Sequence, residues 1–222
     1  MGRELEEMPL FPVNAVLFPY STIHLHVFEP RYLDLVRYCL EYDSPFGIVL
    51  IREGEEVGGP ADPYLVGTAV RIETVHQLEQ GRIDLRLRGE RRFRIREFVD
   101  GQPYSVGRVE PVVEMEIEET PENFGLVQTF RSEFESFIKA RFSQQDFNIK
   151  VTFNDDPQLL SFLVASFLQI PNLERQRLLE TTDTIDRIEL IMPHLTNMIL
   201  DDRAPVTYKL AAPDRSEWIQ PN

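Results

Sequence analysis

Three things are scarce in this sequence: cysteine, lysine and long apolar stretches. Its 222 residues include a single cysteine, Cys39, so no disulfide can form within the chain. That suits a reducing compartment such as the cytosol. No stretch approaches the roughly 18 uninterrupted apolar residues of a membrane span, and the acidic N-terminal residues do not form a secretory signal. These absences predict a cytoplasmic protein that does not insert into a membrane.

Recognisable catalytic motifs are absent as well. A Walker A loop ends in Gly-Lys-Ser/Thr, but Lys139 and Lys150 each follow an isoleucine, and Lys209 follows a tyrosine. No Gly-x-Ser-x-Gly elbow occurs, and the lysines lie in no Ser-Lys peptidase context. The sequence therefore predicts no ATPase or peptidase activity, no catalytic residue, no metal and no cofactor.

The charge is strongly of one sign. The formal net charge is −14, while 42% of the residues are hydrophobic and 10% aromatic. The composition is that of a globular protein. The negative charge disfavours general binding to nucleic acid or to anionic membranes.

The first half of the chain has the pattern of β-strands. Ile23, Leu25 and Val27 alternate with polar residues, which indicates a half-buried strand. Residues 46–51, FGIVLI, form a short apolar run typical of a strand buried on both faces. Residues 81–99 predict a hairpin, with Gly89-Glu90-Arg91 as its turn. One helix is expected within this half, over Pro30–Tyr42, because proline suits the first helical position.

The second half has the pattern of helices. An acidic segment over residues 114–119 leads into a stripe of Phe130, Phe134, Phe137 and Ile138 at helical spacing. Asp155-Asp156-Pro157 predicts a helix start, and Ile170-Pro171 predicts its end. Asp183 predicts the cap of a last helix, in which Pro193 should cause a kink or a break. The expected divisions are a β-rich subdomain at 8–117, a helical subdomain at 118–202 and a tail at 203–222.

Several short motifs, taken in order, resemble one known family. They are Pro9-Leu10-Phe11-Pro12, Leu17-Phe18-Pro19, Phe28-Glu29-Pro30-Arg31-Tyr32, Val66-Gly67-Thr68-Ala69, the segment Gly81–Phe98, Asp155-Asp156-Pro157 and Ile170-Pro171. Over about residues 8–200 the chain resembles the N-terminal, substrate-binding domain of the Lon protease in a stand-alone form.

The resemblance implies an α+β fold: a PUA-like β pseudo-barrel with one inserted helix, followed by a C-terminal helical bundle. It also implies a non-enzymatic module that engages unfolded or hydrophobic polypeptide, or a protein partner, in protein quality control. The ATPase and peptidase of Lon lie further along that protein, so neither activity is expected here. The alternative is a small-molecule or RNA binder that uses the PUA-like barrel.

Two groups of residues are candidates for contact with a partner. The first is Phe28, Glu29, Arg31 and Tyr32, where the alternative interpretation is a helix start with a bracing arginine. The second is Arg92 and Arg94, within a segment that carries seven arginines and two acids (Arg82, Arg86, Arg88, Arg91, Arg92, Arg94 and Arg96; Asp84 and Glu90). Six of these arginines, all but Arg91, are expected on the outer face of the hairpin. They could pair with acidic residues such as Glu114, Glu116, Glu118 and Glu119, or brace the two halves of the chain. They could also bind a protein, or bind nucleic acid, which the lack of exposed aromatics disfavours.

His24 and His26 are a weaker candidate. Two residues apart on one strand, they face the same way and could supply two metal ligands. No zinc-type spacing supplies a third, so ordinary surface histidines are the favoured interpretation.

Overall fold

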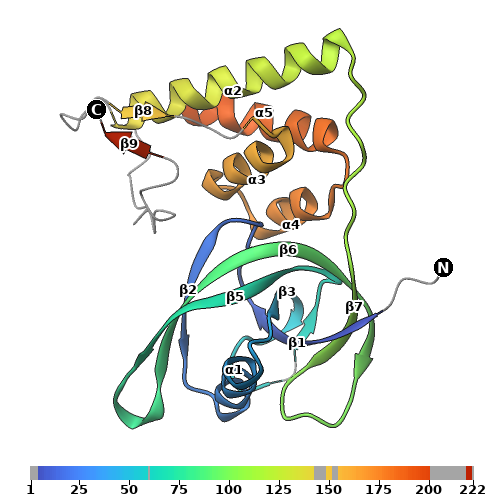
Figure 1. The fold of residues 1–222 in the computed structure, drawn as a ribbon, viewed down its shortest axis with the longest axis vertical. Coiled ribbons are helices and arrows are strands. Elements are labelled where there is room, and N and C mark those ends of the chain that lie inside the picture. The colour runs from blue at the N-terminus through green and yellow to red at the C-terminus, as the bar shows by residue number, and fades with distance from the viewer. Residues whose placement is uncertain (1–4, 60, 143–148, 152–154, 201–218, 222) are drawn as a thin grey trace. The chain divides into compact units, whose positions relative to one another are not determined.

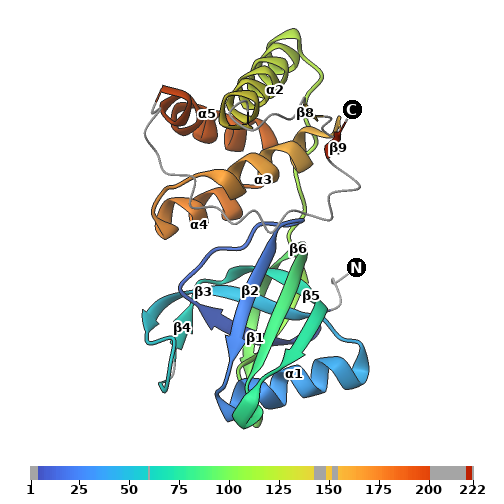
Figure 2. The same cartoon turned by 90° about the vertical axis from the view of Figure 1, so that its left-hand side faces the viewer.

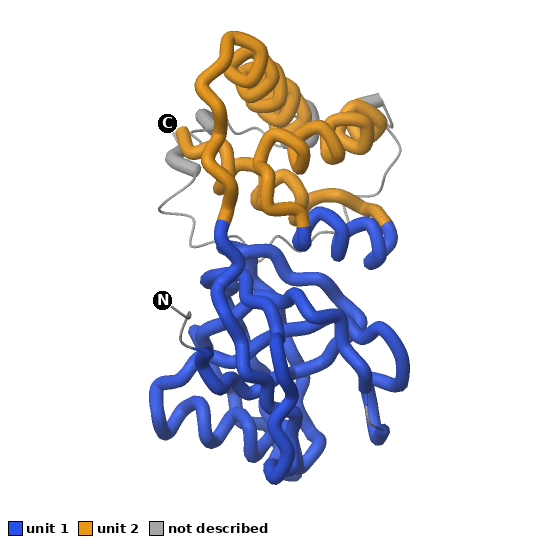
Figure 3. Tube along the Cα trace, turned by 90° about the vertical axis from the view of Figure 1, so that its right-hand side faces the viewer, with its two compact units in different colours: residues 1–113, 171–180 blue, residues 114–170, 181–222 orange. Residues whose placement is uncertain are grey.

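A computed structural model describes residues 5–59, 61–142, 149–151, 155–200 and 219–221. The chain is a mixed α/β protein that divides into two compact units (Figures 1 and 3). Unit 1 comprises residues 1–113 and 171–180, and unit 2 comprises residues 114–170 and 181–222. Within the described residues, no helix is both long enough and apolar enough to cross a membrane.

Unit 1 is built on a seven-stranded sheet in which all but one of the pairings are antiparallel. The path of neighbouring strands is β1-β7-β6-β5-β3-β4, and β2 pairs with β6 beside this path. The exception is a parallel pairing of β1 with β3. The strands are β1 (Glu6–Val13), β2 (Thr22–Val27), β3 (Phe46–Gly54), β4 (Ala61–Pro63), β5 (Val66–Gln77), β6 (Ile83–Val99) and β7 (Val106–Pro111).

The hairpin predicted within residues 81–99 is wrong, because β6 runs without a turn from Ile83 to Val99. The real hairpin joins β5 to β6, and its turn holds Gln80 and Gly81 at positive φ. Gly89 lies inside β6, at a position where the Phe18–Pro19 segment passes close to the strand. A Cβ at this position would come 2.7 Å from the carbonyl oxygen of Phe18. The glycine thus marks a close approach and not a turn.

The predicted helix is confirmed as α1 (Pro30–Tyr42). Its buried face carries Leu35, Val36 and Cys39, which belong to the main core cluster of unit 1 together with strand residues such as Phe46 and Leu85. Cys39 is only 2% exposed, and burial raises the pKa of its thiol to about 12. Cys39 therefore behaves as a small core residue.

Three of the motifs meet at one point of unit 1. The Thr68 hydroxyl donates a 2.6 Å hydrogen bond to the carbonyl oxygen of Leu17, and Thr68 is fully buried. The backbones of Tyr20 and Ser21 bond to Gly89, each at 2.9 Å. The Leu-Phe-Pro and Val-Gly-Thr-Ala segments are therefore scaffold: a buried hydroxyl and a strand backbone satisfy the polar groups of the crossing chain.

A short helix of the second half of the sequence belongs to unit 1. It is α4 (Asn172–Glu180). Gln176 donates a 3.0 Å hydrogen bond to the carbonyl oxygen of Val66, and the Arg175 guanidinium lies 5.1 Å from the ring centre of Phe18. The division into subdomains at 117/118 stays a prediction; by contacts, residues 171–180 group with the strands.

Unit 2 is formed mainly by three helices that pack on one another: α2 (Pro121–Phe142), α3 (Pro157–Phe167) and α5 (Thr184–Leu200). The predicted stripe is confirmed, because Phe130, Phe134, Phe137 and Ile138 are all buried. The helix starts are confirmed too. Asp156 accepts from the backbone of Gln158, and Asp183 accepts from the backbone of Ile185, each at 2.8 Å. The last helix runs through Pro193 without a break.

Two short strands complete unit 2. They are β8 (Ile149–Val151) and β9 (Ile219–Pro221), which pair antiparallel. Most of the predicted tail at 203–222 lies outside the described residues. Phe124, near the start of α2, is 68% exposed.

Candidate partner-binding surface

A surface loop is held against the start of α1. The Gly58 backbone N–H donates a 3.2 Å hydrogen bond to Glu29 Oε2, and Arg31 Nη1 donates a 2.9 Å hydrogen bond to the carbonyl oxygen of Gly59. Arg31 Nη2 also lies 3.1 Å from Glu29 Oε2. The two charges therefore pair with each other and fasten the β3–β4 loop, a role the sequence left open.

Two exposed apolar side chains flank this polar junction. Phe28 precedes Glu29 and is 46% exposed, and Val57 precedes Gly58 and is 52% exposed. Because Glu29 and Gly58 are bonded, their two neighbours lie on adjoining segments. We call Phe28, Glu29, Arg31 and Val57 the Phe28 surface. Val57 is not predicted from the sequence as part of this surface. The signal for it is a single apolar residue inside the otherwise polar loop GEEVGG.

Tyr32 has a different position from its neighbours. It is 5% exposed, and its ring stacks on Phe11 at a 4.0 Å centroid distance and an 18° interplanar angle. The Arg31 guanidinium lies 4.5 Å from the same ring centre. Burial raises the pKa of Tyr32, while the charge of Arg31 acts in the opposite direction. Tyr32 therefore supports Arg31 from the core side, and its contact with a partner stays a prediction.

The arginines of β6 do not form one exposed face. Arg92 is 4% exposed and donates to the carbonyl oxygen of Leu179 on α4. Its predicted place on an exposed outer face is wrong, because α4 covers that part of the sheet. Arg94, two residues on, is half-buried. The role of Arg92 and Arg94 with a partner stays a prediction.

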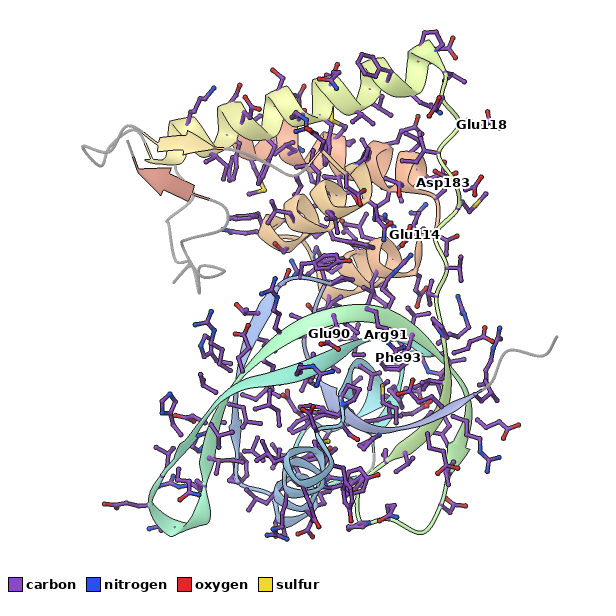
Figure 4. All side chains as sticks on the ribbon, in the orientation of Figure 1. Glu90, Arg91, Phe93, Glu114, Glu118 and Asp183 are labelled. Carbon is purple, nitrogen blue, oxygen red and sulfur yellow. The ribbon has the colours of Figure 1, made fainter. Side chains whose placement is uncertain are left out.

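Most other arginines of β6 pair with carboxylates of unit 1. Arg91 pairs with Glu6 at 2.6 Å, Arg86 with Glu73 at 2.9 Å, and Arg96 with Glu110 at 2.5 Å. Figure 4 labels Glu90, Arg91 and Phe93 along this strand. Glu73 and Glu110 lie on β5 and β7, which pair with β6, and Glu6 lies on β1. The partners of these three arginines are therefore acids of the sheet and not the predicted acids of residues 114–119.

No metal centre is found in the described part of the chain: no group of three or more histidine, cysteine or acidic side chains could hold an ion. His26 Nδ1 lies 2.7 Å from Asp84 Oδ1, with both side chains about half exposed. His24 is exposed on the same face.

Comparisons with known proteins give one consistent result. The family model described as the ATP-dependent protease La (LON) substrate-binding domain matches residues 7–197. The chain is 25% identical over 193 residues to a Lon protease of Heliobacterium modesticaldum, covering 85% of this chain and 24% of that protein. It is 29% identical over 198 residues to a Lon protease of Syntrophus aciditrophicus, covering 85% and 25%. The chain thus spans about a quarter of the length of these relatives.

Two solved structures are similar to this one. A Lon N-terminal domain protein from Xanthomonas campestris matches with a TM-score of 0.62 and 32% identity, covering 85% of this chain and 98% of that one. The N-terminal domain of a Mycobacterium avium complex Lon protease matches with a TM-score of 0.67 and 17% identity, covering 86% and 99%. The second likeness is one of fold alone.

Proposed function

The chain belongs to the family of ATP-dependent protease La (LON) substrate-binding domains, and from this premise we propose that it is a non-enzymatic recognition module for unfolded or hydrophobic polypeptide. The observation that carries the proposal is the Phe28 surface. Exposed Phe28 and Val57 flank a fixed pair of charges. Exposed aromatic and apolar side chains beside an arginine are common in protein-binding sites.

The finer architecture is part of the same proposal. We infer that the sheet of unit 1 is a PUA-like pseudo-barrel with α1 inserted, and that α2, α3 and α5 form a C-terminal bundle. The expected subdomains at 8–117 and 118–202, a cytoplasmic location and a role in protein quality control also stay proposals. They are supported by the family and by its relatives, which are named Lon proteases.

Binding to a permanently unfolded protein tests the proposal. The probe is reduced and carboxymethylated lactalbumin, titrated by fluorescence anisotropy, with native lactalbumin as the comparison. The paired substitutions Phe28→Ser and Val57→Ser should weaken binding about tenfold, because they remove buried apolar area from the complex. The matched control is Phe124→Ser, which removes an exposed phenylalanine of unit 2 and should change the affinity less than about twofold.

Equal affinity for the native and unfolded forms would overturn recognition of unfolded chains. Hydrolysis of casein, with or without ATP, would overturn the non-enzymatic assignment. The salt dependence separates the RNA alternative: phosphate contacts would make RNA affinity fall steeply with salt. Apolar polypeptide binding should change little. The pairing of Arg86, Arg91 and Arg96 with carboxylates of unit 1 gives the RNA alternative little support.

A further inference from the structure

The outer edge of β2 is open. Within the described residues β2 pairs with β6 and with no other strand, and Figure 2 shows β2 and β6 side by side. The other strands around it have neighbours on both sides over at least part of their length, except the three-residue β4. One side of β2 therefore has no partner strand in the described part of the chain, and His24 and His26 lie along it.

The register fixes which backbone groups point outward. The Gly89 N–H donates to the carbonyl oxygen of Ser21 at 2.9 Å, and the ladder continues from Thr22↔Arg88 to Val27↔Ile83. In an antiparallel ladder the bonded pairs alternate, so Ile23, Leu25 and Val27 bond to β6. The N–H and C=O groups of His24 and His26 consequently point away from the sheet, and both residues are exposed.

This edge lacks the usual protection against a further strand. Natural edge strands carry proline, lysine, bulges or inward charges that prevent pairing. The sequence of β2, TIHLHV, contains no proline, glycine or lysine, and its pairing with β6 shows no register shift. Ile23 and Leu25 pack against the core but are only partly buried, so another strand would cover them.

The neighbouring strand suggests the composition of the missing one. On the outer face Thr22 lies opposite Arg88, His24 opposite Arg86 and His26 opposite Asp84. Arg86 already pairs with Glu73, and His26 Nδ1 lies 2.7 Å from Asp84 Oδ1. Among the described residues, Arg88 forms no ion pair with a carboxylate and is the charge left for a partner. A strand added beside β2 would direct alternate side chains toward this polar face and the others toward Ile23 and Leu25. The edge therefore fits a segment that alternates polar residues, acids among them, with apolar residues.

We propose that β2 binds an extended segment of an unfolded polypeptide as an additional strand, held by the backbone groups of His24 and His26. This inference rests on the proposed function and deepens it by giving the substrate a conformation and a site. Binding by strand addition draws affinity from the main chain and selectivity from alternate side chains. It would explain how one module accepts many unfolded sequences, because every such segment offers the same backbone groups.

A proline at the edge tests the backbone contact. His24→Pro removes an outward N–H, and proline is tolerated at an edge position where that group faces solvent. His24→Ala is the matched control, since it removes the imidazole and keeps the N–H. The probe is a short synthetic peptide of alternating valine and glutamate, measured by anisotropy. We expect His24→Pro to weaken binding about tenfold and His24→Ala less than about twofold. Circular dichroism should give both variants the wild-type melting profile.

The peptide supplies a test that needs no change in the protein. N-methylation of every second amide blocks the hydrogen bonds of one edge of the peptide and leaves the other edge intact. Methylation of the set that faces β2 should abolish binding, and methylation of the other set should preserve it. Equal loss, or no loss, with both sets would overturn strand addition, and this result also decides the matter if His24→Pro fails to fold.

Failure of this inference can be told apart from failure of the proposed function. Strand addition is wrong if His24→Pro binds the peptide as tightly as the wild type does and both methylated peptides bind as tightly as the unmethylated one. If unfolded lactalbumin still binds through Phe28 and Val57 in that case, the proposed function stands. If wild-type protein binds neither lactalbumin nor the peptide, the proposed function itself is wrong.

Discussion

The paired arginines on the sheet of unit 1 and the buried Arg187 of unit 2 differ in how far they are removed from water. On the sheet of unit 1, Arg86, Arg91 and Arg96 pair with carboxylates while roughly a third to a half of each side chain remains exposed. In unit 2, Arg187 is 0% exposed, and its guanidinium lies 4.0 Å from the ring centre of Phe162. Exposed pairs contribute little to stability, whereas a buried charge is costly unless all its donors are satisfied.

The buried site in unit 2 satisfies that condition. The Arg187 side chain donates to Ser161 Oγ at 2.9 Å, the carbonyl oxygen of Thr181 at 2.6 Å, Thr184 Oγ1 at 3.1 Å and Glu114 Oε2 at 3.2 Å. Burial lowers the pKa of Arg187, and the nearby charges of Glu114 and Asp183, both labelled in Figure 4, offset this effect. One side chain thus joins the first residues of unit 2 to α3 and α5.

The largest effect is expected from Arg187→Met. It removes these hydrogen bonds and leaves the Glu114 carboxylate, 14% exposed, without its guanidinium. The free energy of unfolding of unit 2 should fall by about 3–5 kcal/mol, measured by urea denaturation with circular dichroism. Adding Glu114→Gln should restore part of the loss because no unpaired charge remains. A loss as small as that of an exposed pair would remove the contrast between the units.

Cys39 reports whether that loss stays within unit 2. The thiol lies in the core of unit 1. Its raised pKa of about 12 keeps it protonated and unreactive in the folded state. Labelling by a thiol reagent therefore requires unit 1 to open. Since the contacts of Arg187 described above all lie within unit 2, we expect Cys39 labelling in Arg187→Met to stay as slow as in the wild type. Fast labelling would mean that the two units unfold together.

A second effect compares a glycine of each unit. Gly89→Ala places a Cβ 2.7 Å from the carbonyl oxygen of Phe18 in unit 1. Because the neighbouring backbone must move to make room, the substitution should destabilise the protein by about 1–3 kcal/mol. Gly125 lies inside α2 of unit 2, with nothing within 4 Å of an added Cβ. Gly125→Ala should therefore stabilise by up to about 1 kcal/mol, because alanine favours the helix. Thermal melting gives both signs, and a neutral Gly89→Ala would contradict the close approach.

The helix starts and Gly89 show where prediction from sequence succeeds and where it fails. Local signals were sufficient for α1, which begins at Pro30, and for α3 and α5, which begin after Asp156 and Asp183, because a helix start is fixed by neighbouring residues. The sequence predicts a turn at Gly89, but β6 continues through it. Turns and close crossings of two segments both require glycine, and only the position of the second segment distinguishes them. That segment contains Phe18, which lies far away in the sequence.

The candidate site divides in the same way. Phe28, Glu29 and Arg31 were found as one local motif, and their exposure and pairing agree with a surface role. Val57 could not be linked to them, because the bond between Glu29 and Gly58 joins residues 29 positions apart. Arg92 was expected to be exposed, and its burial depends on α4, which follows it by about eighty residues. The open edge of β2 was invisible, since an edge is defined by which strand is absent.

The smallest effect is expected from an exposed pair of unit 1. Arg91 and Glu6 are 39% and 48% exposed and 2.6 Å apart. A double-mutant cycle with Arg91→Gln and Glu6→Gln should give a coupling of about 0.2–1 kcal/mol. In about 1 M salt, where the screening length falls to about 3 Å, this coupling should nearly vanish. The coupling between Arg187 and Glu114 should persist in the same salt, because ions do not reach a buried pair. If both couplings vanish, Arg187 is accessible to solvent ions, and the difference between the two units is one of number of contacts and not of burial.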